Sequence, residues 1–154
     1  MIQDPRDPGE APGDFRFSEA AAVAVFQARH EALHLGTADV TPGHLALGVL
    51  KALPAEGRTR LLPDPAGYAR LCRRLGAGTA AAPPIPEEVE YTAAARSAFA
   101  TARAEAGPAE IEPLHLLVGA LCHGDAATIA ALEEAGLPLE AVRRRIGAGE
   151  GPVP

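Results

Sequence analysis

Apolar residues recur at three- and four-residue intervals along much of the chain, which is the spacing of a helix with one buried face. Six residues of the first such stretch fall on one helical face: Ala21, Ala24, Val25, Ala28, Ala32 and Leu35. Phe17-Ser18 precedes the stretch and provides an N-cap, and Gly36 follows it at a position where a positive φ costs glycine nothing. The pattern predicts a helix over residues 18–35.

Start and stop signals divide the rest of the chain into further helices. Thr41-Pro42 is typical of an N-cap followed by a proline in the first turn, and Asp125 and Pro138 stand in comparable positions. The stretch HLALGVLKAL after Pro42 is apolar nearly all round, which is typical of a helix buried between others. The predicted helices are 18–35, 42–53, 58–62, 66–75, 89–106, 112–122, 125–135 and 138–146.

The predicted helices form two copies of one unit. Three matches share an offset of 71 residues: HLALGVL at His44 with HLLVGAL at His115, RRLGAG at Arg73 with RRIGAG at Arg144, and Gly36 with Gly107. Three matches at one spacing indicate an internal repeat. The copies are residues 17–78 and 88–149, each with four helices. Since one copy alone makes a marginal core, we expect the two to pack face to face in one all-α domain with pseudo-twofold symmetry.

Segments poor in apolar residues frame the repeats. Residues 1–14 are rich in proline and acidic groups and predict a disordered arm. Residues 79–87 predict a linker between the copies, and residues 151–154 a tail. The domain therefore spans residues 15–150.

The composition agrees with a helical protein. Of its 154 residues 47% are hydrophobic but only 4% are aromatic, so the apolar content is mostly Ala, Leu and Val, which favours close-packed helices. The net charge of −6 gives no overall attraction to nucleic acid or to an anionic membrane. No apolar run reaches about 18 residues, so we expect no membrane span and a cytoplasmic protein. The frequent use of Ala, Arg and Pro is typical of a GC-rich bacterial genome.

The two cysteines, Cys72 and Cys122, form neither a C-x-x-C motif nor a disulfide framework. Both lie in apolar helical stretches, so we expect reduced thiols that are in the core or half-buried. Tyr68, Tyr91 and Phe99 are expected in the core, because single aromatic residues at helical spacing usually pack there.

The repeat resembles a known family. Phe17-Ser18-Glu19 opens a long helix with Ala-x-x-x-Ala and with Leu-Gly at its end, and HLALGVL follows after a short loop. In the second copy a third helix ends in Gly and LEAVRRR follows. This arrangement resembles the repeat of the Clp N-terminal domain, the substrate- and adaptor-binding domain of Clp-type AAA+ unfoldases. The resemblance covers about residues 17–149 and implies two tandem four-helix Clp repeats.

The resemblance implies a binding function without catalysis. The sequence contains no G-x-x-x-x-G-K-[ST] motif and no length for an ATPase module, so we expect no cofactor and no catalytic residue. The implied partners are a Clp unfoldase, its clients or peptides, with the chain acting as adaptor, substrate-binding module or competing decoy. A monomer is the expected state, and an oligomerisation role stays open.

The family's binding positions depart from its pattern here. In relatives of the Gram-positive type, a Glu before each repeat's His receives phosphorylated arginine, but this chain has Gly43 and Leu114 there, which implies a more apolar ligand. Some actinobacterial relatives bind cyclic peptide antibiotics through a phenylalanine that begins each repeat, so a sink for such peptides is a second hypothesis. The implied peptide-binding residues are Phe15, Phe17, Gly43 and Leu114, with Glu87 and Glu88 at the start of the second repeat.

One motif favours an enzyme. His30-Glu31-Ala32-Leu33-His34 matches H-E-x-x-H, in which two histidines bind zinc and the glutamate acts as general base. A zinc protease also needs a third protein ligand, and no spacing in the sequence recommends one. With Ala28, Ala32 and Leu35 facing inward, we expect His30, Glu31 and His34 to face water. The sequence therefore predicts no metal, with His30 and His34 as the candidates if one binds.

His44 and His115 are a second symmetric pair of possible ligands. Each begins a buried helix, where an imidazole can bond to free backbone groups near the helix start. We expect this structural role for both.

Overall fold

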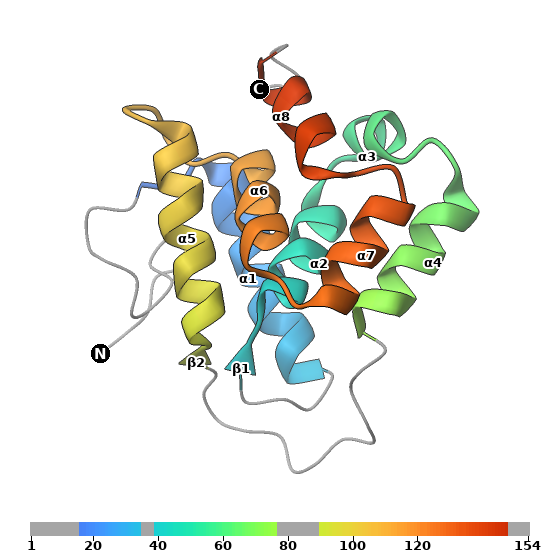
Figure 1. Cartoon of the computed structure of the whole chain (residues 1–154), viewed down its shortest axis with the longest axis horizontal. Coiled ribbons are helices and arrows are strands. Elements are labelled where there is room, and N and C mark those ends of the chain that lie inside the picture. Colours follow the sequence, from blue (N-terminus) through green and yellow to red (C-terminus); the bar gives the residue numbers. More distant parts are fainter. Residues whose placement is uncertain (1–15, 35–38, 77–89, 148–154) are drawn as a thin grey trace.

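The computed structural model describes residues 16–34, 39–76 and 90–147, which form eight helices and two short strands (Figure 1). The first repeat contributes α1 (Glu19–His34), β1 (Asp39–Val40), α2 (Pro42–Ala52), α3 (Ala55–Leu61) and α4 (Pro65–Gly76). The second contributes β2 (Glu90–Tyr91), α5 (Ala93–Ala106), α6 (Pro113–His123), α7 (Ala126–Glu134) and α8 (Leu139–Gly147). The all-α class is confirmed. The predicted arm, linker and tail lie outside the described residues.

The two apolar helices α2 and α6 pack against each other at the centre of the molecule (Figure 1). Each is buried along most of its length, as its apolar sequence predicts. Helix α1 packs on α2 and α5 packs on α6, and one apolar cluster fills the space among these four. A second cluster lies between the central pair and α3, α4, α7 and α8. The paired contacts give the pseudo-twofold arrangement that the repeat predicts.

Side-chain caps fix the starts of the helices, as the sequence predicts. The Ser18 hydroxyl accepts a hydrogen bond from the Ala21 backbone N–H at 3.0 Å, and the Asp125 carboxylate accepts one from the Thr128 N–H at 2.8 Å. Each bond satisfies a backbone donor that the first helical turn leaves without a partner. The predicted short third helix is longer than expected, since α3 begins at Ala55 instead of Arg58.

Two short parallel pairings join the repeats and were absent from the sequence prediction. Strand β1 pairs with β2 through Asp39 with Glu90 and Val40 with Tyr91, and Phe17 forms a bridge with Ile111. The prediction that a helix starts at residue 89 is therefore wrong. Tyr91 is extended, and the Thr92 hydroxyl then caps α5 by accepting from the Ala95 N–H at 3.0 Å.

The bridges also correct the register between the first helices of the two repeats. Phe17 and Tyr91 hold equivalent places, each before a capping residue and each edge-on to the Phe99 ring, at 5.9 Å and 5.2 Å between ring centroids. Their offset is 74 residues, whereas α2 and α6 keep the offset of 71. The second-repeat counterpart of Phe17 is thus Tyr91, and the expected counterparts Glu87 and Glu88 lie outside the described residues. The new register aligns ARHEA (28–32) with ARAEA (102–106).

A glycine allows the close helix crossing in each repeat. A Cβ atom at Gly48 of α2 would collide with the Ala24 and Ala28 backbone of α1, and one at Gly119 of α6 would collide with the Ala98 backbone of α5. Only glycine permits this approach of two helix backbones. Gly48 and Gly119 are related by 71 residues, and their partners Ala24 and Ala98 by 74.

Candidate functional site

The described residues that were predicted to bind peptide lie inside the fold. Phe17 and Leu114 are only 4% and 3% exposed, and Gly43 is buried as well. Phe17 belongs to the cluster around α1 and α5, whereas Leu114 belongs to the cluster on the other side of the central helices. A ligand could reach these two side chains only by displacing packed neighbours. Phe15, Glu87 and Glu88 lie outside the described residues.

The two positions that replace the family's glutamates are closed off by their surroundings. A Cβ atom at Gly43 would lie 3.2 Å from the Thr128 hydroxyl of α7 and 3.5 Å from the Thr41 hydroxyl. Leu114 contributes its side chain to the apolar core. Neither position offers a carboxylate to a guanidinium group.

Two apolar side chains are exposed on the outer face of α1, and the sequence prediction missed them. Phe26 is 53% exposed and Val23 is 44% exposed. They lie one helical turn apart, outside the predicted inward face of α1, and that misplacement is the sequence signal that could have identified them. In the second repeat the register of 74 places Ser97 and Ala100 at the equivalent positions. The exposed apolar pair is therefore a feature of the first repeat.

The glutamate of the H-E-x-x-H motif is occupied by a structural ion pair. Glu31 is only 7% exposed, and its Oε2 lies 3.0 Å from the Nζ of Lys51 on α2. The expectation that Glu31 faces water is wrong, because α1 turns this residue toward α2. His30 is exposed, as expected, and the side chain of His34 is outside the described residues. Within the described residues no three His, Cys, Asp or Glu side chains gather as a metal site would require.

The second repeat contains the same carboxylate with a different partner. Glu105, which the register of 74 aligns with Glu31, binds Arg143 of α8 through two hydrogen bonds of 3.2 Å and 3.0 Å. Lys51 aligns with Cys122 and Arg143 aligns with Cys72, both at an offset of 71. The cation and the cysteine have thus exchanged positions between the repeats.

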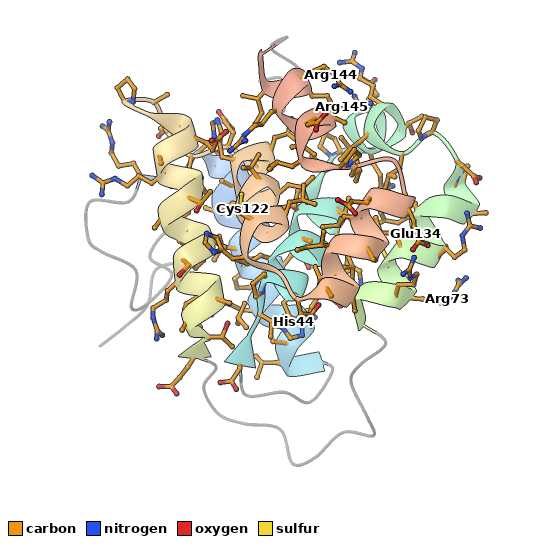
Figure 2. The ribbon with its side chains drawn as sticks, in the orientation of Figure 1. His44, Arg73, Cys122, Glu134, Arg144 and Arg145 are labelled. Carbon is orange, nitrogen blue, oxygen red and sulfur yellow. The ribbon has the colours of Figure 1, made fainter. Side chains whose placement is uncertain are left out.

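The environments of the two cysteines differ. Cys72 is half-buried, and this burial raises the pKa of its thiol. Cys122 is exposed on α6, so the expectation that it is at least half-buried is wrong (Figure 2). Tyr68 is half-buried beside Cys72 with the Arg58 guanidinium 4.9 Å above its ring, while Tyr91 and Phe99 are in the core as predicted.

The two histidines cap the central helices, which confirms their predicted structural role. The Nδ1 of His44 accepts a hydrogen bond from the Thr41 N–H at 3.0 Å, and the Nδ1 of His115 accepts one from the Glu112 N–H at 2.8 Å. Each imidazole thus replaces the Glu or Gln of a capping box. Burial lowers the pKa of both side chains, more than nearby carboxylates raise it. The neutral imidazole is the form that can accept this bond.

Positive charge gathers on the helices farthest from α1 and α5. Eight of the 14 lysine and arginine residues lie on α3, α4 and α8, including Arg73, Arg144 and Arg145 (Figure 2). Two contacts use this charge to hold the repeats together: Arg74 binds Glu134 of α7 at 2.7 Å, and Arg145 donates to the Arg60 carbonyl at 3.1 Å. No helix in the described ranges has both the length and the apolar character to cross a membrane.

Comparison with known proteins identifies the fold. No family model matches the sequence, and no curated protein matches it. Three solved structures are similar to the chain. The first comes from structural investigations of a malarial protein secretion system, with a TM-score of 0.72 and 19% identity over 88% of this chain and 95% of that one. The second is the Hsp104 N-terminal domain from Candida albicans, with a TM-score of 0.65 and 17% identity over 84% and 88%. The third is the N-terminal domain of the caseinolytic protease associated chaperone ClpD from Arabidopsis thaliana, with a TM-score of 0.61 and 20% identity over 86% and 95%.

Proposed function

We propose that this chain, whose fold is that of a Clp N-terminal domain, is a non-catalytic module of the Clp protease system that binds peptides or proteins. The observation that carries the proposal is the match of the whole two-repeat arrangement, which extends over at least 84% of this chain in each of the three structures. The fate of Glu31 supports the same view, because a carboxylate that neutralises Lys51 is not free to act as a general base.

The chemistry of the exposed surface favours an apolar polypeptide ligand. Phe26 and Val23 form an apolar pair on α1, and large exposed side chains of this kind are typical of protein interaction sites. Gly43 and Leu114 offer no carboxylate that would select a basic ligand. Phe15 precedes α1 by four residues, so we propose that it extends the same surface, with Phe17 holding that segment to the core. Glu87 and Glu88 precede β2 and are the proposed polar margin.

The module could act in two opposite ways on a Clp unfoldase. As an adaptor it would present clients, and as a decoy it would withhold them. A degradation assay with a purified Clp unfoldase, its peptidase and a fluorescent client separates the two. An adaptor raises the rate of client loss as this chain is added, whereas a decoy lowers it. Pull-down of neither a Clp component nor a peptide ligand, together with an unchanged degradation rate, would contradict the proposal.

The two repeats provide matched variants for this assay. Phe26→Ser removes the exposed apolar group of the first repeat, and Ala100→Ser makes a comparable change at the equivalent place in the second. Neither side chain is buried, so both variants should keep the fold. We expect Phe26→Ser to abolish most of the effect on the degradation rate and Ala100→Ser to keep it.

A second candidate function is a sink for cyclic peptide antibiotics that target Clp N-terminal domains. The observation that favours it is the equivalence of Phe17 and Tyr91, which gives each repeat an aromatic residue before its first helix. Both rings are buried, so such a peptide would need to open the bridges. Isothermal calorimetry with a cyclic peptide of this class tests it, and Tyr91→Ala should weaken any binding that depends on the second repeat.

A further inference from the structure

The C-terminal end of α5 contains a small cavity flanked by two guanidinium groups. Its volume is about 200 Å³. The lining residues are Arg16, Arg103, Gly107, Pro108, Ala109 and Ile111. Both arginines are exposed at its rim, and the rest of the lining comes from the loop that connects α5 to α6.

Backbone contacts hold this cavity in shape. The Arg16 carbonyl accepts from the Ile111 N–H at 2.8 Å, and an Arg16 Nη2 donates to the Pro108 carbonyl at 3.2 Å. Gly107 has φ of 62° and donates its N–H to the Arg103 carbonyl at 3.0 Å, so the loop turns directly after the helix. The Phe17–Ile111 bridge fixes the segment of Arg16 beside that loop. The cavity is therefore part of the folded domain.

The equivalent place in the first repeat has a different charge pattern. The register of 74 aligns Arg103 with Arg29 and Arg16 with Glu90. One repeat thus places a cation and an anion at these two positions, whereas the other places two cations. Two like charges at one rim repel each other, and an anion between them relieves that repulsion. Guanidinium groups bind carboxylates through paired hydrogen bonds.

We propose that the Arg16–Arg103 cavity binds a carboxylate from residues 1–15 of the same chain. That segment has four carboxylates, Asp4, Asp7, Glu10 and Asp14, against the one cation Arg6. It enters the fold at Arg16, beside the cavity. Six residues separate Glu10 from Arg16, and a chain of that length reaches up to about 20 Å. A ligand tethered so closely has a high effective concentration at the site.

A peptide-binding measurement on the full chain tests the proposal. The probe is a fluorescent peptide with the sequence of residues 1–15, acetylated and amidated so that only its side chains carry carboxylates. The protein carries Asp4→Asn, Asp7→Asn, Glu10→Gln and Asp14→Asn, which empties the site of its own segment. Fluorescence anisotropy should detect binding that weakens as salt rises from low to about 0.5 M. The wild-type chain should bind the probe about tenfold more weakly, because its own segment competes.

Arg103→Ala and Arg29→Ala are matched changes, since each removes one cation from the same place in a different repeat. On the neutralised background Arg103→Ala should weaken binding about tenfold or more, whereas Arg29→Ala should leave it unchanged. Equal losses from both would show a general charge effect and overturn the proposal. Equal binding to the wild-type and neutralised chains would show that residues 1–15 do not occupy the cavity, which also overturns it. Circular dichroism confirms that each variant is folded.

Discussion

The two repeats solve one problem in two ways. Glu31 and Glu105 lie at equivalent points near the ends of α1 and α5, and each needs a cation. In the first repeat the cation is Lys51 on the central helix α2, while in the second it is Arg143 on α8. The position without a cation holds a cysteine in each case. The fold thus requires a charge beside each carboxylate but accepts it from either helix.

Burial differs between the two ion pairs as well. The Glu31 side chain is 9% exposed, whereas that of Glu105 is 25% exposed. A charge on the central helix lies deeper than one on the outer helix, so the first pair is expected to matter more for stability.

The largest predicted effect tests what the repeats share. Gly48→Ala and Gly119→Ala should each lower the free energy of unfolding by about 3 kcal/mol, because the added methyl group meets helix backbone that cannot yield. Gly57→Ala is the control. Its Cβ would touch only Pro54 and Leu53 at 3.8 Å or more, and it should stabilise α3 by about 0.5 kcal/mol. Urea unfolding followed by circular dichroism measures all three. A large loss at only one of the two crossings would contradict the symmetry.

The next effect tests the difference between the ion pairs. Lys51→Met should cost about 2 kcal/mol, because it leaves the Glu31 carboxylate buried without its partner. Adding Glu31→Gln should recover part of that loss. Arg143→Met should cost clearly less, since both of its charges reach solvent. Urea unfolding of the four variants provides the comparison, and equal losses for Lys51→Met and Arg143→Met would contradict the difference in burial.

A transplant sharpens the comparison. If Cys72 and Arg143 are equivalent, Cys72→Arg should place a guanidinium near Glu31. Combined with Lys51→Met, it should recover about 1 kcal/mol of the lost stability. Thermal or urea unfolding of the single and double variants checks this. A double variant no more stable than Lys51→Met alone would show that the two positions are not interchangeable.

The smallest effect concerns the histidine caps, in which the repeats agree. The pKa of His44 and of His115 is lowered in the fold from 6.5, so the folded chain binds fewer protons than the unfolded chain. Their stabilising contribution is complete above pH 6.5 and is lost as the pH falls below it toward the lowered values. Glu31, Glu105 and Glu112 oppose the shift but do not outweigh burial.

The measurement is the urea midpoint as a function of pH between about 5 and 7.5. His44→Gln keeps an acceptor for the Thr41 N–H without a titrating ring, so it should flatten this dependence at a cost of about 1 kcal/mol. His115→Gln should act in the same direction. Unchanged pH dependence in the double variant would contradict the assignment.

Local signals in the sequence sufficed for most of the fold. The caps at Ser18 and Asp125 and the apolar central helices follow from rules that act within a few residues. The β1–β2 pair could not be predicted, because two extended residues have no periodicity and their partner is far away in the chain. Its absence also hid the register of 74, although the match of ARHEA with ARAEA was available in the sequence.

The candidate site was harder to predict than the fold. Phe17 was identified by its place in the repeat, yet tertiary packing buries it against Phe99. Glu31 was assigned to solvent from a helical face alone, although α2 covers that side of α1. Phe26 has no counterpart in the second repeat, so a comparison of the repeats could not point to it.

The central claim is that this Clp-type fold binds unfolded polypeptide through an apolar surface of its first repeat. Fluorescence anisotropy of a labelled, permanently unfolded client titrated with the full chain tests it most directly. We predict saturable binding that Phe26→Ser weakens about tenfold or more and that Ala100→Ser leaves unchanged. Absence of binding, or equal affinity of the two variants and the wild-type chain, would contradict the claim.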